Sequence, residues 1–207
     1  MVKRRELDHG LEEIQQLLVE MGRRVEQALT AAMNALQAID VAKARRVISR
    51  DAELNALEMN ITELGAKLMA TQQPVAKDLR NILAALKISS DLERMGDLAV
   101  DIAKVTLRLE GQQLIKPLVD LPRLAALVGA MIADSVRSYL DENVDLAYKL
   151  DADDDAVDAL YSQILREMFT LMAENPERIP QSMLLSFVGR YIERIGDHAT
   201  NIGESTV

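Results

Sequence analysis

The sequence predicts an all-α protein made of two tandem, similar three-helix bundles. Of the 207 residues, 49% are hydrophobic but only 3% are aromatic, and none is Trp. A core of Ala, Leu, Ile and Met suits helix packing better than a β-sandwich. Proline is confined to three places, and between them apolar residues recur every three or four positions, as a buried helix face requires. A third observation, a motif of thirteen residues that occurs twice, indicates a duplication.

The first half of the chain contains three predicted helices, at about 8–38, 41–71 and 76–109. The apolar face of the first helix consists of Leu7, Leu11, Ile14, Leu18, Met21, Val25, Leu29, Ala32 and Leu36. No Pro or Gly separates the first helix from the second, but Asp40 precedes a new amphipathic run and is a favourable N-cap. Pro74 separates the second helix from the third.

The second half repeats this arrangement, with predicted helices at about 121–141, 146–174 and 178–205. Pro117 and Pro122 mark the start of the fourth helix, and Pro176 and Pro180 separate the fifth from the sixth. Asp145 stands before Leu146 and Ala147 as Asp40 stands before the second helix, so we predict that Asp145 is an N-cap.

The repeated motif relates the third helix to the sixth. Residues 91–103, DLERMGDLAVDIA, align without a gap with residues 191–203, YIERIGDHATNIG. The identical pairs, all separated by 100 positions, are Glu93 and Glu193, Arg94 and Arg194, Gly96 and Gly196, Asp97 and Asp197, Ala99 and Ala199, Ile102 and Ile202. A weaker echo sets Asp51 and Asn55 against Asp154 and Asp158, at a separation of 103. We therefore predict two repeats, residues 1–111 and 112–207.

Each copy of the motif places acidic side chains in a column. Because an α-helix turns about 100° per residue, positions i, i+4 and i+8 share one face. The two columns are Glu93, Asp97 and Asp101 in the first repeat, and Glu193, Asp197 and Asn201 in the second. The apolar residues fall on the opposite side, so the acidic columns are predicted to lie outside the bundle core.

Two interpretations of the acidic columns remain open. Most charge runs are solvated helix faces, but like charges at i, i+4 are destabilising, and a solubilising face usually intersperses Lys. A stacked acidic column present twice favours a cation site. Gly96 and Gly196 lie beside the acids, where they either admit another group or allow close helix packing. Arg94 and Arg194 either orient a carboxylate or neutralise it.

The available ligand atoms restrict the kind of metal. Without cysteine, a metal must be bound by oxygen or His, and all-oxygen sites suit Mg²⁺, Ca²⁺, Mn²⁺ or iron better than a closed zinc site. We interpret His198 as a structural residue, and we assign no role to His9. The acidic run at 151–155 lacks the Gly and the distal Glu of an EF-hand, so it is interpreted as acids at a helix start.

Charge and hydropathy limit the partners of the chain. The net charge of -9 argues against direct nucleic-acid binding. Residues 1–111 hold 17 acids and 16 bases, whereas residues 112–207 hold 16 acids and 8 bases, so the second half carries nearly all of the charge. The N-terminal residues lack the apolar region of a signal peptide, and no apolar run is long enough to span a bilayer. A cytoplasmic protein is expected.

The two motifs resemble the paired E(D)xxxD signatures of the PhoU family, and residues 72–80, QQPVAKDLR, resemble the segment before its first signature. The resemblance implies two similar three-helix bundles, a cytoplasmic homodimer and multinuclear metal ions of uncertain identity: iron, zinc, manganese or magnesium. It implies a negative regulator of phosphate uptake and of the phosphate-starvation response. The implied partners are a sensor histidine kinase and the ATPase subunit of the phosphate ABC transporter, with the membrane contacted only through them. The metal ligands it implies are Glu93, Asp97, Asp101, Glu193 and Asp197, and Asn201 departs from the acidic pattern.

Two other functions are less well supported by the sequence. A carboxylate-bridged di-iron enzyme of the ferritin-like kind needs Glu-x-x-His on two core-facing helices, and only Glu6 and His9 fit this spacing. No Gly-rich phosphate loop or Ser/His/Asp arrangement occurs, so no enzyme is expected. A helical scaffold without a functional metal is the other alternative.

Overall fold

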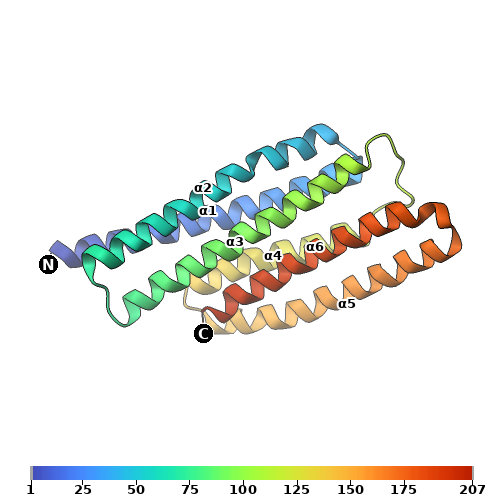
Figure 1. Ribbon diagram of the computed structural model, residues 1–207. Coiled ribbons are helices and arrows are strands. Elements are labelled where there is room, and N and C mark those ends of the chain that lie inside the picture. Colours follow the sequence, from blue (N-terminus) through green and yellow to red (C-terminus); the bar gives the residue numbers. More distant parts are fainter. Residues whose placement is uncertain (1, 207) are drawn as a thin grey trace.

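The computed structural model describes residues 2–206, and within them the chain forms six α-helices and one short 3₁₀ turn (Figure 1). The helices are α1 (Val2–Ala38), α2 (Val41–Gln72), α3 (Lys77–Arg108), α4 (Asp120–Leu140), α5 (Val144–Glu174) and α6 (Ile179–Glu204), and the 3₁₀ turn η1 is Pro176–Arg178. The predicted all-α fold of two similar three-helix bundles is confirmed, and most helix ends fall within a few residues of the predicted ones.

The two bundles pack side by side and share one apolar core. Helices α1, α2 and α3 contact one another, as do α4, α5 and α6, while α1 packs on α4 and α3 packs on α6 (Figure 1). The predicted apolar faces are buried, and the fully buried positions opposite the acids are Ile88, Leu92, Met95, Ala99, Ile102, Val188, Ile192, Ile195, Ala199 and Ile202. None of the helices within residues 2–206 combines the length and apolar character that crossing a bilayer requires.

The turns after α1 and α4 have the same conformation, 103 residues apart. Ile39 and Glu142 both adopt a positive φ, at 47° and 49°, which reverses the chain without Gly or Pro. Asp40 is the N-cap of α2, since its side chain accepts a hydrogen bond of 2.9 Å from the amide of Lys43. Its equivalent in the second repeat is Asn143, whose side chain accepts from the amide of Leu146 at 3.0 Å.

The predicted N-cap role of Asp145 is therefore wrong. Helix α5 begins at Val144, and Asp145 lies inside its first turn, where a carboxylate interacts favourably with the helix dipole without capping. The connection from α3 to α4 is held against α6 by the buried Gln181, which accepts a hydrogen bond from the amide of Ile115 at 2.6 Å. The predicted repeat boundary at 111/112 lies in this connection, and the division into 1–111 and 112–207 stays a prediction.

Candidate metal centres

The acidic column of each motif faces further acids on the neighbouring helix. The first acidic cluster lies between α2 and α3, and the second lies between α5 and α6. The first contains Glu93 and the three acids whose charges act on it, Asp97, Glu58 and Asp51. It also contains Asp101, whose charge acts on Asp51. The second contains Glu193 and the three acids whose charges act on it, Asp197, Asp158 and Asp154, with Asn201 one turn further along the same column of α6. Each cluster therefore draws on two helices, not on the motif helix alone.

The first acidic cluster is partly neutralised by basic side chains of α3. The Arg94 guanidinium lies 3.7 Å from a Glu93 oxygen and 3.5 Å from an Asp97 oxygen, and the Lys104 ammonium lies 2.8 Å from Asp101. Burial, followed by the charge of Asp97, raises the pKa of Glu93. The same two causes, in the same order, raise the pKa of Asp51. The carboxylates of this cluster are thus crowded even with their basic neighbours.

The second acidic cluster is more deeply buried than predicted. Glu193 is only 7% exposed, so the prediction that every acid of the columns lies outside the packed helices is wrong at this position. The spacing of residues along a helix predicts which way a side chain points, but not how closely the neighbouring helix packs against it. Here α5 packs on α6 and Glu193 is buried. Its ion pair is with Arg190, one turn before it, and Arg194 forms no ion pair in the part of the chain described, contrary to the role considered for it.

Two carboxylate oxygens of the second acidic cluster lack any hydrogen-bond donor. They are Glu193 Oε2 on α6 and Asp154 Oδ1 on α5, and both are inaccessible to solvent. A buried carboxylate oxygen without a partner is costly, and a bound cation is one way to satisfy it. Burial, then the charges of Asp158 and Asp197, raises the pKa of Asp154 to about 6. The donor set is entirely oxygen, which fits a hard cation.

The positions of the side chains do not by themselves enclose an ion. Within residues 2–206, no three His, Asp or Glu side chains come together closely enough to hold a metal ion. The metal-ligand assignment of Glu93, Asp97, Asp101, Glu193, Asp197 and Asn201 therefore stays a prediction. The unpartnered oxygens and the crowding of the carboxylates are the observations that favour a cation at the second acidic cluster.

The two motif glycines differ in how closely side chains of the neighbouring helix approach them. A Cβ atom at Gly96 would collide with the end of the Leu54 side chain on α2. At Gly196 a Cβ atom would meet Asp154 Oδ1 at 3.5 Å and Val157 at 3.6 Å, which is ordinary contact. Only Gly96 therefore leaves room that a larger residue would fill, and the group it admits is a side chain of the neighbouring helix, as close helix packing requires. Since Leu54 and Val157 are 103 residues apart, both glycines face equivalent positions of the two repeats.

The remaining residues considered from the sequence lie outside the clusters. His198 Nδ1 is 2.9 Å from Asp91 Oδ1, across the interface of α6 and α3, which supports the structural interpretation. His9 and Glu6 are exposed on α1, and Glu6 accepts a hydrogen bond from Gln72, so they do not form a core-facing di-iron motif. The acids at 151–155 lie within α5 and not at its start.

The predicted site includes no residue of this acidic run, but Asp154 lies in it. Its carboxyl group belongs to the second acidic cluster. The echo of Asp51 and Asn55 at a separation of 103 was the sequence signal that could have placed it there.

The raised pKa of Asp154 predicts how an Asp154→Asn variant behaves without metal. The folded protein holds this proton up to about pH 6, whereas the unfolded chain loses it near 3.8, so the stability of the wild type falls as pH rises through that window. The variant removes the repulsion. Allowing for solvent screening at this half-buried position, we expect the free energy of unfolding to rise by about 1 kcal/mol at neutral pH, with little change near pH 4.

Urea unfolding in the presence of a chelator, measured at both pH values, tests this expectation. Asp153→Asn is the matched control, since Asp153 is a neighbouring α5 acid that pairs with Lys149 at 2.6 Å and gains nothing from losing its charge. An Asp154 variant that is less stable than the wild type at neutral pH would contradict the electrostatic account.

Known proteins similar to this chain agree on one family. The PhoU domain family matches the chain twice, over residues 18–106 and 121–206. A protein of Clostridium acetobutylicum, described as a phosphate-specific transport system accessory protein PhoU homolog, is 38% identical over 99% of this chain and 94% of its own length. A homolog of the same description from Aquifex aeolicus is 40% identical over 89% of this chain and 83% of its own length.

Two solved structures share the architecture. The crystal structure of PhoU from Pseudomonas aeruginosa superimposes with a TM-score of 0.91 at 34% identity, covering 96% of each chain. The structure of the phosphate transport system regulatory protein PhoU from Streptococcus pneumoniae gives a TM-score of 0.85 at 29% identity, covering 97% of this chain and 95% of that one.

Proposed function

This chain belongs to the PhoU family, and from that premise we propose that it is a metal-binding accessory regulator of phosphate transport. The relatives are described as accessory or regulatory proteins of phosphate transport, which supports the coarser role. The observation that supports metal binding is the pair of buried, unpartnered oxygens on Asp154 and Glu193.

The proposed metal ions occupy the two acidic clusters. The first would be held by Glu93, Asp97 and Asp101 with Asp51 of α2, and the second by Glu193, Asp197 and Asn201 with Asp154 of α5. Bound cations would supply positive charge that neutralises mutually repelling carboxylates. The ions are proposed to be multinuclear, drawn from iron, zinc, manganese or magnesium. Because Asn201 offers a neutral amide oxygen in place of a carboxylate, the second cluster would hold a less charged or smaller set of ions.

The regulatory role is proposed to be negative and cytoplasmic. As a homodimer, the protein would connect the ATPase subunit of the phosphate ABC transporter to a sensor histidine kinase and restrain the phosphate-starvation response when phosphate is plentiful. It would reach the membrane only through these partners, bind no nucleic acid and catalyse no reaction. A scaffold without functional metal is the competing proposal. The two proposals differ in whether regulation requires the acidic clusters.

A complementation experiment tests this function. In a strain that lacks its PhoU homolog, expression of this chain should restore repression of phosphate-starvation genes in phosphate-rich medium. A variant combining Glu93→Ala, Asp97→Ala, Glu193→Ala and Asp197→Ala should fail to restore it, because both clusters lose two of their ligands. Circular dichroism should show an unchanged helix content, since the apolar core lies on the opposite helix faces. Full repression by the folded variant would favour the scaffold.

A further inference from the structure

A cavity of about 550 Å³ opens between α1 and α2 of the first bundle. Its basic lining residues are Arg23 and Arg24 of α1 and Lys43, Arg46 and Arg50 of α2, and Asp51 of α2 and Val100 of α3 also line it. Five lining residues are basic and two are acidic, although residues 1–111 hold nearly equal numbers of acids and bases, 17 and 16. The cavity is therefore more basic than the half of the chain that forms it.

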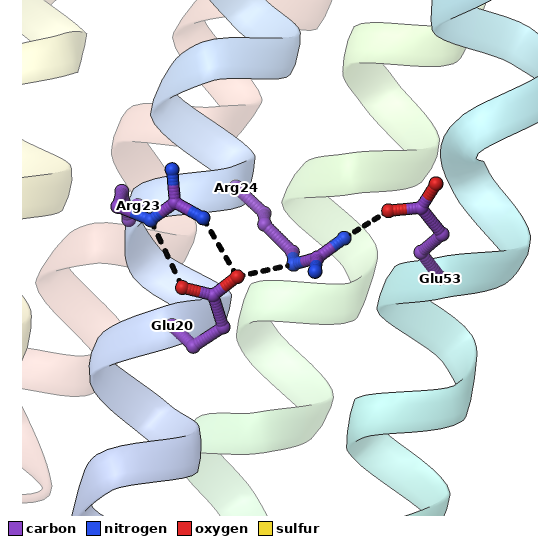
Figure 2. Close-up of polar contacts among 4 residues, drawn as sticks. All are labelled: Glu20, Arg23, Arg24 and Glu53. Carbon is purple, nitrogen blue, oxygen red and sulfur yellow. Dashed lines mark hydrogen bonds and ion pairs between the residues drawn. The ribbon is translucent and has the colours of Figure 1, made fainter.

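Two of the five bases are neutralised by ion pairs. Arg23 donates two hydrogen bonds to Glu20, of 2.9 and 2.7 Å, and Arg24 bridges Glu20 on α1 to Glu53 on α2 (Figure 2). Because α1 and α2 run antiparallel, this group of charges marks the end of the cavity far from the α1–α2 turn. The bases nearer the turn, Lys43, Arg46 and Arg50, take no part in these ion pairs.

Of the three bases of α2, only Lys43 has an ion pair within the described residues, and its partner Asp40 also interacts electrostatically with Arg46. Arg46 donates only to the Ala42 carbonyl, at 3.3 Å, and within residues 2–206 no carboxylate forms an ion pair with Arg46 or Arg50. The Lys43 ammonium is 3.7 Å from Asp40, a carboxylate already engaged in capping α2. Lys43, Arg46 and Arg50 are spaced i, i+3 and i+7, so they line one face of the helix. All three side chains are exposed, and like charges at this spacing destabilise a helix by a few tenths of a kcal/mol, a repulsion that an anion bound between them would remove.

The second repeat shows that the fold does not require these bases. At a separation of 103, which the α1–α2 and α4–α5 turns share, the five basic positions become Ala126, Leu127, Leu146, Lys149 and Asp153. The one base that remains, Lys149, is paired with Asp153 at 2.6 Å and with Asp134 at 2.9 Å. Asp134 occupies the position equivalent to Ala31. The same architecture therefore forms without a positive cavity, so helix packing does not explain the bases of the first repeat.

The size and lining of the cavity indicate the class of ligand. Lys43 and Arg50 are separated by about 10 Å along the helix, more than a single phosphate spans, and Arg is well suited to binding phosphate oxygens. The cavity also has an apolar part, formed by Ala28, Val47 and Val100, that could receive a ring. Its volume lies in the range of small-molecule sites, about 300–1,000 Å³.

We infer that this cavity binds a small organic polyphosphate of the nucleoside di- or triphosphate class, with Lys43, Arg46 and Arg50 on its phosphates and the apolar part of the lining on its base. This function goes beyond the proposed role in phosphate regulation. The site is separate from the second acidic cluster and meets the first only at Asp51. A metal-free measurement can therefore detect it alone.

Calorimetric titration with ATP in the presence of EDTA tests the inference. The wild type should bind one ATP per chain, and an Arg46→Gln, Arg50→Gln variant should bind at least tenfold more weakly. Arg45→Gln is the matched control, because Arg45 is an exposed base of the same helix that does not line the cavity. Its affinity should fall much less than that of the double variant, since a neighbouring charge that does not contact the ligand acts only through longer-range attraction that salt screens.

A second variant tests the site without removing any base. Ala31→Asp places in the cavity the carboxylate that the second repeat carries as Asp134, and it should abolish ATP binding while circular dichroism stays unchanged. Three results would overturn the inference: no binding of ATP to the wild type, equal affinity of the folded variants and the wild type, or orthophosphate binding as tightly as ATP. Equal weakening by Arg45→Gln would show nonspecific attraction and would overturn it as well.

Discussion

Replacing Asp97 by alanine is expected to remove the metal of the first acidic cluster and to leave the second cluster loaded. Asp97 is the acid whose charge acts on both Glu93 and Asp51, so it lies at the centre of the first cluster. The second cluster uses ligands of α5 and α6 and shares none of these residues. Elemental analysis of protein purified in the presence of metal should show loss from one site only, and anomalous scattering from crystals should show which site is lost.

The reciprocal variant, Glu193→Gln, should empty the second acidic cluster and spare the first. Asp153→Asn, on α5 beside Asp154, is the control that should keep both sites loaded. Simultaneous loss from both clusters in either single variant would mean one shared site, and the two-site proposal would be abandoned. All variants should remain helical even after chelation, because the fully buried residues of α3 and α6 lie opposite the acids and need no ion for burial.

Apolar spacing and one duplicated motif were sufficient to predict most of this fold. The residues that recur every three or four positions from Leu7 to Leu36 do form the buried face of α1, because burying that face is what stabilises a long amphipathic helix. The residue type and position of Asp40 predict its capping role correctly. They do not identify its equivalent Asn143, because the neighbouring Asp145 offers the same chemistry two residues later.

The parts of the site that were missed depend on contacts between helices. A helical wheel places Glu193 on one face of α6, but only the packing of α5 against that face makes Glu193 buried and Asp154 its neighbour. The basic cavity cannot be predicted from the sequence for the same reason, since Arg46 and Arg24 come from different helices. A single-sequence pattern describes one helix at a time, and a site between helices needs the register of both.

The predicted effect of metal on partner binding follows from the charges of the two clusters. With cations bound, the clusters could bridge to carboxylates on another protein, whereas empty clusters would repel acidic surfaces and attract basic ones. We therefore expect binding to the cytoplasmic part of a phosphate-responsive histidine kinase, or to the transporter ATPase subunit, to depend on metal. Chelation should weaken it by about tenfold or more, equivalent to about 1.4 kcal/mol, and high salt should weaken it further.

A titration of the partner against wild type and the four-residue variant of Glu93, Asp97, Glu193 and Asp197, at low and at high salt, measures this effect. A second variant, Asp153→Asn, removes an acid near the second cluster without removing a proposed ligand and should bind like the wild type. If the folded four-residue variant bound as tightly as the wild type at both salt concentrations, partners would dock elsewhere, and any metal would have a structural role only. Weaker partner binding by that variant, together with weaker binding by the chelated wild type, would assign the interface to the metal-loaded clusters. Electrostatic contacts across an interface are weakened both by salt and by removal of charge.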